Sequence, residues 1–196
     1  MPFIIYIHGF NSSELSHKSQ LVKQRMQALG LGEQFACPRL PWQPQAAIDQ
    51  LSEQIEDLQM EGYEVTLVGS SLGGFYASFL SDKFGLKAVL VNPAVEAPVL
   101  LRDYLGEQTN PYTQETYVLE EAHMQELEDL QTWQPRPENI WLMVQEGDEV
   151  LDYQAALNAY PHVAHKTHEP NGDHSFVGFE RHVDDILRFA GFTDVA

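Results

Sequence analysis

Four runs of mostly apolar residues recur along the chain, and each is bounded by glycine, proline or polar residues. Such continuous runs, rich in β-branched residues, are typical of strands that a parallel sheet buries on both faces. They predict strands at residues 3–7, 65–68, 87–91 and 140–144. Two weaker runs, at 35–37 and 163–167, predict short additional strands, the second of them near the edge of the sheet.

Between these runs the apolar residues recur every three or four positions, which is the period of an amphipathic helix. The clearest stripe, Ile48, Leu51, Ile55 and Leu58, predicts a helix that ends near Gly62. Similar patterns predict helices over about 16–29, from 75 to near Gly85, over about 152–159 and over 178–190. Strands that alternate with helices indicate a three-layer α/β fold with a mostly parallel sheet. Right-handed crossovers then bring the turns after the strands together at one edge of that sheet.

The segment 94–139 departs from this alternation. Prolines and tyrosines interrupt it, and it offers one plausible acidic amphipathic helix, at about 119–131. It is far longer than an ordinary connection between two strands. We interpret it as a cap inserted into a single domain, 1–196, over the C-terminal edge of the sheet. The alternative is a partly disordered excursion on the surface.

The turn after the strand at 65–68 reads Gly-Ser-Ser-Leu-Gly-Gly, and a helical pattern follows at once. Strand, glycine turn and helix form the setting in which Gly-x-Ser-x-Gly carries a nucleophile. Gly69 and Gly73 stand two residues before and after Ser71, where the turn is too tight for a side chain, whereas Ser70 lacks such flanks. Ser71 is therefore the predicted nucleophile, and the alternative is a glycine turn with an incidental serine.

A serine hydroxyl needs a base that titrates near neutral pH, and a third group must orient that base. His174 lies in a turn after the last predicted strand, and Asp148 lies in the turn after the strand at 140–144. The chain order Ser71, Asp148, His174 is the order of α/β-hydrolase triads. Three nearby carboxylates compete with Asp148 for this role: Glu146, Glu149 and Asp152.

The tetrahedral intermediate of acyl transfer also needs two N–H donors. The amide of Leu72 directly follows the nucleophile, and the turn His8-Gly9-Phe10 after the first strand should present the amide of Phe10. His8 itself stands at the end of the strand, where a role in shaping the turn fits better than catalysis.

The net charge of −18 argues against a nucleic-acid partner and against an anionic membrane surface. The single cysteine cannot form an internal disulfide, and no apolar run approaches the length of a membrane span. A cytoplasmic location is expected by elimination. We expect no cofactor and no metal, because His162, His165 and His168 would not share one face of a strand.

The motifs HGFNSS, VGSSLGG, VNPAV, DYLG…NPYT and GDEVLDY, with the turn at His174, resemble the small intracellular esterases of the YqiA-like family. That family belongs to the α/β-hydrolase superfamily, and the resemblance covers nearly the whole chain, the segment 94–139 included. It implies a compact α/β-hydrolase without the first strands of larger members. It also implies esterase activity on acyl esters, with Ser71, Asp148 and His174 as the triad.

The sequence therefore favours a serine esterase that acts on a small acyl ester through an acyl-enzyme. An acyl thioesterase or an acyltransferase would use the same residues, and a non-catalytic binding module on a hydrolase scaffold is the alternative of a different class. Nothing in the sequence indicates the oligomeric state. Candidate residues for the acyl pocket come from the segment 94–139: Tyr104, Tyr112, Tyr117 and Trp133.

Overall fold

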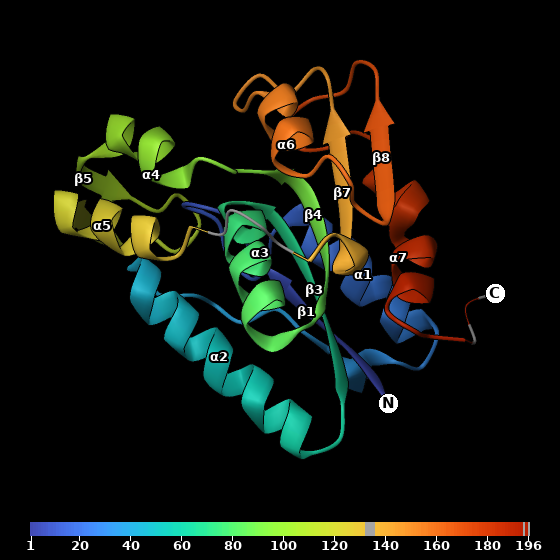
Figure 1. Cartoon of the computed structure of the whole chain (residues 1–196). Helices are drawn as coiled ribbons and strands as arrows, with labels where there is room; N and C mark the ends of the chain where they lie inside the picture. The colour runs from blue at the N-terminus through green and yellow to red at the C-terminus, as the bar shows by residue number, and fades with distance from the viewer. Residues whose placement is uncertain (132–135, 194, 196) are drawn as a thin grey trace.

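A computed structural model describes residues 1–131, 136–193 and 195 (Figure 1). Within these residues, six parallel strands form one sheet in the order β2–β1–β3–β4–β7–β8. β8 is an edge strand, as its weakly apolar sequence predicts. The parallel sheet confirms the predicted fold class. The strands are β1 (Pro2–Ile7), β2 (Phe35–Ala36), β3 (Glu64–Ser71), β4 (Lys87–Pro93), β7 (Ile140–Gln145) and β8 (His165–Glu169).

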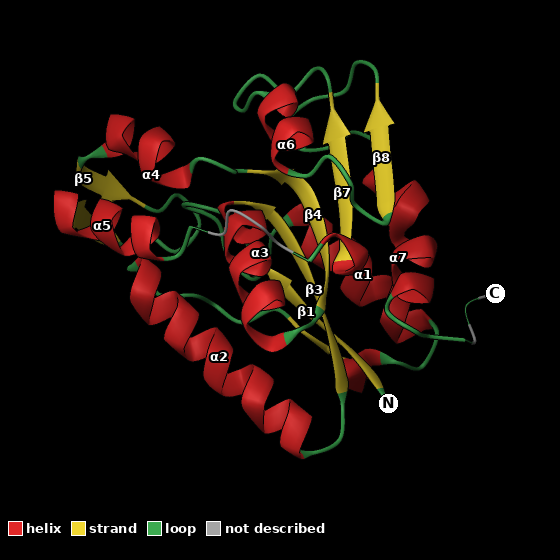
Figure 2. Cartoon of the chain, viewed as in Figure 1, coloured by secondary structure: helices red, strands yellow, loops and turns green. Residues whose placement is uncertain are grey.

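Helices cover both faces of the sheet, which makes the three layers visible in Figures 1 and 2. Successive strand residues point to opposite faces, so Ile4 and Ile5 of β1 belong to two separate hydrophobic clusters. One face carries α2 (Pro44–Met60), α3 (Leu72–Phe84) and α6 (Tyr153–Ala159). The other carries α1 (His17–Ala28) and α7 (Val183–Phe189).

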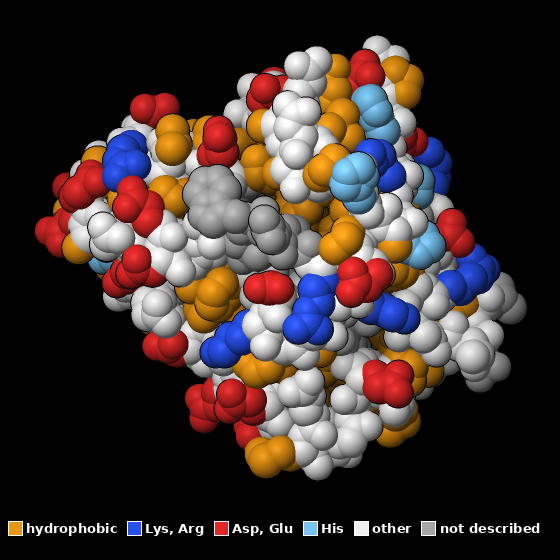
Figure 3. All heavy atoms as spheres, in the orientation of Figure 1, with side chains coloured by type: hydrophobic (Ala, Val, Ile, Leu, Met, Phe, Trp, Pro, Cys, Tyr) orange, Lys and Arg blue, Asp and Glu red, His pale blue; other side chains and the backbone are white. Residues whose placement is uncertain are grey.

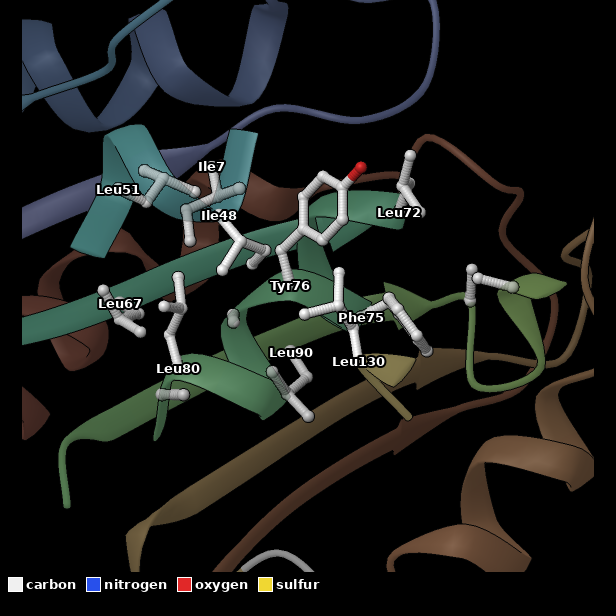
Figure 4. Packing of buried hydrophobic residues seen from close by; sticks show 14 of the residues in the cluster. Ile7, Ile48, Leu51, Leu67, Leu72, Phe75, Tyr76, Leu80, Leu90 and Leu130 are labelled. Atoms are coloured by element: carbon white, nitrogen blue, oxygen red, sulfur yellow. The ribbon is translucent and has the colours of Figure 1, made fainter. Parts of the chain in front are cut away.

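The larger cluster fixes α3, and with it the turn at Ser71, against the sheet. Figure 4 shows Phe75, Tyr76 and Leu80 of α3 packed among side chains of the strands and of α2. Leu80 and Leu90 are fully buried, and Leu72 at the first position of the helix is 7 % exposed. Burying side chains of this size contributes about 1.5–3 kcal/mol each. The start of α3 is therefore held firmly at the C-terminal edge of the sheet.

The described part of the segment 94–139 is folded. It contains α4 (Ala97–Leu100), the hairpin of β5 (Gly106–Thr109) and β6 (Thr116–Leu119), and α5 (Glu121–Asp129). Met124 and Leu127 of α5 are fully buried and belong to the same cluster as α2 and α3. The segment thus shares the main hydrophobic core with the sheet.

Several boundaries and elements differ from the sequence expectations. The last predicted helix, 178–190, begins as a short 3₁₀ helix, Phe179–His182, and only then becomes α7. The predicted strand at 163–167 is displaced to His165–Glu169. The hairpin and α4 were not expected, because β5 is a polar strand and α4 spans a single turn.

In the view of Figure 3, acidic side chains gather over α4 and α5. This distribution agrees with the excess of 29 acidic residues over 11 lysines and arginines. In the part of the chain that the structure describes, no helix is both long and apolar enough to cross a membrane.

Candidate active site

Ser71 lies at the sharp junction between β3 and α3 and has a strained backbone, with φ 57° and ψ −121°. Non-glycine residues rarely adopt such a conformation, which persists only where the surroundings enforce it. The glycines on both sides make the turn possible. A Cβ atom on Gly69 would lie 2.2 Å from the carbonyl oxygen of Gly73, and one on Gly73 would lie 2.0 Å from the carbonyl oxygen of Ile7. The spacing of the two glycines in the sequence thus reflects a real steric requirement.

The turn after β1 approaches the Ser71 turn closely. A Cβ atom on Gly9 would lie 3.3 Å from Cβ of Ser71 and 3.9 Å from the amide nitrogen of Leu72. The amide of Leu72 is the first of α3 and has no partner within the helix. Among the described residues, neither this N–H group nor that of Phe10 donates a backbone hydrogen bond to another segment. Both are therefore free to donate to an oxyanion beside Ser71.

Asp148 and His174 meet at the ends of β7 and β8. Nδ1 of His174 lies 2.9 Å from both carboxylate oxygens of Asp148. The Asp148 side chain is 2 % exposed and that of His174 is 22 % exposed. Because an ionised carboxylate only accepts hydrogen bonds, Nδ1 carries the proton and Nε2 is left as the basic nitrogen.

The environment of Asp148 favours its ionised form. Burial by itself raises the pKa of this carboxyl. The hydrogen bond from His174 and those from the N–H groups of Leu151 and Val150, each 2.9 Å long, outweigh burial and lower the pKa. Asp148 is therefore ionised at neutral pH.

The three competing carboxylates have other partners. Glu146 contacts the ring of His168 at 2.9 Å, and Asp152 caps α6 by accepting from the N–H group of Gln154. Glu149 accepts the backbone N–H of His174 at 3.0 Å, which lowers the pKa of Glu149. Of these acids, only Asp148 contacts the imidazole of His174 within the described residues.

Two buried side-chain amides hold the loop of His174, and sequence reasoning missed both. Gln145 ends β7 and is 2 % exposed; its Oε1 accepts from the N–H groups of Asp173 and Val177. Its Nε2 donates to the carbonyl of Val177 and to Glu169. A polar residue at the end of an otherwise apolar strand was the available signal.

Asn92 makes the equivalent link from β4. Its Nδ2 donates to the carbonyl oxygens of Asp173 and His174 at 3.1 and 3.0 Å, and its Oδ1 accepts from the N–H of Gln145. Asn92 has a positive φ of 40° and is 3 % exposed. The loop that presents His174 is thus tied to the ends of two strands.

One cavity of about 490 Å³ brings Ser71 and His174 together. Its walls include both residues, the turn at Gly9 and Phe10, and the start of α1. In the described part of the chain the Ser71 hydroxyl makes no hydrogen bond to His174; such bonds are often loose in free enzymes and tighten when substrate binds. The residues predicted as nucleophile, base and acid therefore border one site or lie directly behind it.

His8 has both ring nitrogens engaged by the backbone. Its Nε2 accepts the N–H of Leu40 at 3.1 Å, so Nδ1 carries the proton and donates to the carbonyl of Gly9. Burial lowers the pKa of His8 despite the bond to Gly9. These contacts fit the expected role of His8 in shaping the turn.

The candidate pocket tyrosines lie in different places. Tyr112 borders the cavity of Ser71 and His174. The ring of Tyr104 packs edge-on against Phe10 instead, and Tyr117 stacks on Trp42 and donates a hydrogen bond to Asn11. Trp133 falls outside the described residues.

Metal ligation finds no geometric support in the described residues, where no three or more His, Cys, Asp or Glu side chains gather closely enough to hold an ion. His165 packs instead against the rings of Trp141 and Phe189, and His168 pairs with Glu146.

The parallel sheet, the strained serine turn and the acid–histidine pair at the same edge define an α/β-hydrolase fold. Solved structures share it. Mouse alpha/beta hydrolase domain-containing protein 10 has a TM-score of 0.71 at 18 % identity, over 96 % of this chain and 90 % of its own. Est1E from Butyrivibrio proteoclasticus with bound ferulic acid has a TM-score of 0.68 at 13 % identity, over 96 % of this chain and 88 % of its own. A monoacylglycerol lipase from Paleococcus ferrophilus has a TM-score of 0.65 at 14 % identity, over 96 % of this chain and 93 % of its own. At these identities the likeness is one of fold.

The family follows from the sequence itself. The model of the uncharacterised protein family UPF0227 matches residues 3–191, so the chain belongs to that family. This result confirms the resemblance to the YqiA-like family that the motifs carry.

Proposed function

We propose that this protein is a serine hydrolase that cleaves carboxylic esters through an acyl-enzyme on Ser71. The observation that carries the proposal is the meeting of three features at one edge of the sheet. Ser71 lies on a strained turn, His174 borders the same cavity, and Asp148 holds Nδ1 of His174 at 2.9 Å. The fold that the chain shares with a solved esterase and a monoacylglycerol lipase supports a hydrolase.

The first half of the reaction forms the acyl-enzyme. Nε2 of His174 takes the hydroxyl proton of Ser71 as Oγ attacks the ester carbonyl. The N–H groups of Leu72 and Phe10 stabilise the negative oxygen of the tetrahedral intermediate. His174 then gives its proton to the leaving alcohol oxygen as the carbon–oxygen bond breaks, and the acyl group stays on Ser71.

The second half releases the acid. His174 takes a proton from water, the resulting hydroxide attacks the acyl carbonyl, and the same N–H groups hold the second oxyanion. Collapse of this intermediate returns the proton from His174 to Ser71 and frees the carboxylic acid. Asp148 keeps the proton on Nδ1 throughout and stabilises the imidazolium in both halves.

A fluorophosphonate probe tests the nucleophile, because it modifies activated serines irrespective of the natural substrate. Wild-type protein should label, and Ser71→Ala should not. Ser70→Ala is a matched control, since Ser70 borders the same cavity but has no activating turn. Labelling that persists in Ser71→Ala, or that fails in folded wild-type protein, contradicts the proposal and favours a binding module.

Turnover tests the other two residues. On an activated short-chain ester, His174→Ala and Asp148→Asn should each lower kcat by about 10³–10⁴-fold with folding retained. Near-normal turnover in either variant would reassign that role. A panel of esters and acyl thioesters of graded chain length then separates esterase from thioesterase activity.

A further inference from the structure

The cavity at Ser71 differs in charge from the rest of the molecule. Acidic residues outnumber lysines and arginines by 29 to 11 in the chain, yet none of the described residues that line this cavity is Asp or Glu. The basic side chains that line it are one lysine and three histidines: Lys18, His8, His17 and His174. A cavity that is lined by a cation and by no carboxylate, in an otherwise acidic protein, favours an anionic ligand.

Lys18 is the fixed positive charge of this cavity. It lies in the first turn of α1, half-buried, and its Nζ donates to the carbonyl of Ser175 at 3.0 Å. The helix dipole of α1 adds potential of the same sign at that end. An ammonium group has three N–H donors, so two remain for a ligand.

No carboxylate of the described residues lies within ion-pair distance of Lys18. Asp173 and Asp148 act on it only at longer range, and they partly offset the lowering of the Lys18 pKa by burial. The arginines Arg39, Arg102, Arg181 and Arg188, in contrast, all have carboxylate partners.

The position of Lys18 also indicates which part of the substrate it meets. Lys18 is bonded to the residue that follows His174, whereas the N–H groups proposed for the oxyanion lie at Phe10 and Leu72. The histidine must reach the leaving oxygen of the ester to protonate it. The side of the cavity next to His174 is therefore the side of the alcohol.

We infer that the enzyme prefers esters whose alcohol part carries a negatively charged group, and that Lys18 binds this group. This inference rests on the proposed hydrolase function and adds a substrate class to it. A carboxylate or a phosphate would satisfy the same ammonium, so the test includes both.

Matched aryl acetates test the preference. The anionic substrates are the acetate esters of 4-hydroxybenzoate and of 4-hydroxyphenyl phosphate, and the neutral one is the acetate ester of methyl 4-hydroxybenzoate. Each kcat/KM is divided by the rate of hydroxide hydrolysis of the same ester to correct for leaving-group reactivity. The anionic-to-neutral ratio should exceed one in the wild type and fall by about 10–100-fold in Lys18→Gln. The larger of the two anionic ratios distinguishes carboxylate from phosphate.

Two further variants serve as controls. Lys18→Arg keeps the charge and should retain most of the preference, whereas Lys23→Gln removes an exposed charge from the same helix and should leave the ratio as it is. If Lys18 only balances the charges of Asp148 and Asp173, Lys18→Gln lowers turnover of all three esters equally. That outcome, or a wild-type ratio of one, overturns the inference.

A binding measurement tests the role of Lys18 independently of turnover. In the Ser71→Ala background, NMR titration should show that 4-hydroxybenzoate binds about 10-fold more weakly once Lys18 is Gln, with little change for its methyl ester. Equal binding of the two ligands overturns the inference even if the hydrolase is active. Conversely, absence of fluorophosphonate labelling in folded wild-type protein refutes the proposed hydrolase. The NMR titration then still decides whether Lys18 binds an anion in this cavity.

Discussion

The two halves of the candidate site are positioned by different forces. Around Ser71 the backbone is held by crowding: glycine hydrogens fill spaces in which a Cβ atom would lie 2.0–2.2 Å from a carbonyl oxygen. Around His174 the backbone is held by hydrogen bonds from two buried amide side chains, Gln145 and Asn92. The position of Ser71, the proposed nucleophile, therefore depends on the absence of neighbouring side chains, and that of His174, the proposed base, depends on two particular side chains.

This difference determines how each half responds to mutation. Steric crowding against backbone atoms cannot be relieved without moving a strand or a helix, because well-packed interiors yield little. A hydrogen-bonded loop can lose one bond, shift slightly and remain folded. Changes at the serine turn should thus act on stability first, and changes behind His174 should act on activity as well.

The largest effect is expected for Gly73→Ala. Its Cβ atom would lie 2.0 Å from the carbonyl oxygen of Ile7, so α3 must move away from β1, at a cost of at least about 3 kcal/mol in the free energy of unfolding. Helix propensity alone predicts the opposite: replacing glycine by alanine in a helix should raise the free energy of unfolding by about 1 kcal/mol. Urea denaturation decides between them. Gly62→Ala is the control: φ is +87° there with nothing within 4 Å, and the cost should stay at about 1–2 kcal/mol.

An intermediate effect is expected for Gln145→Leu. The substitution leaves the N–H groups of Asp173 and Val177 without their acceptor and should cost about 2–3 kcal/mol of unfolding free energy. Displacement of His174 by even 1 Å should also lower kcat by about 10²-fold. Steady-state hydrolysis of an aryl acetate, together with denaturant titration, separates the two effects.

Tyr160→Phe is the matched control for Gln145. It removes one buried hydrogen bond, to Ser78 at 3.0 Å, and neither residue borders the cavity of Ser71. It should cost about 1 kcal/mol and leave kcat as it is. If Gln145→Leu likewise lowers stability without lowering kcat, the amide does not position His174.

The smallest effect is expected for the pH dependence contributed by His8. Burial holds its pKa in the folded protein below the ordinary value of 6.5. As pH falls below about 6.5, the unfolded chain binds a proton at His8 that the folded chain does not yet bind. The free energy of unfolding therefore decreases until the pH passes the pKa of His8 in the folded protein. His8→Gln should make this acid-side decline shallower. Parallel curves for the two proteins between pH 8 and 5 would show that His8 does not contribute.

The contrast between the halves also explains what the sequence could predict. Gly69 and Gly73 are visible as a local motif because each stands two residues from Ser71, although the atom that a side chain on Gly73 would meet belongs to Ile7, far away in the sequence. Asp148 and His174 could be chosen from the topology, since both follow strands of one parallel sheet. Gln145 stood out only as a polar residue at the end of an apolar strand. Its role and that of Asn92 could not be predicted, because both act on a loop 28 and 81 residues away in the sequence, through side-chain bonds to its backbone. The polar strand of the hairpin and Lys18 in an amphipathic helix carried no local signal.

The hairpin of β5 and β6 is fastened to the turn of Phe10 by three contacts. Asn110 donates to the carbonyl of Ser12, and Asn11 bonds to both Gln108 and Tyr117. A swing of the hairpin away from the sheet would therefore break these tethers or drag the Phe10 amide with it. Because the Phe10 amide is a proposed oxyanion donor, we expect the hairpin to keep its place on the sheet during the proposed reaction.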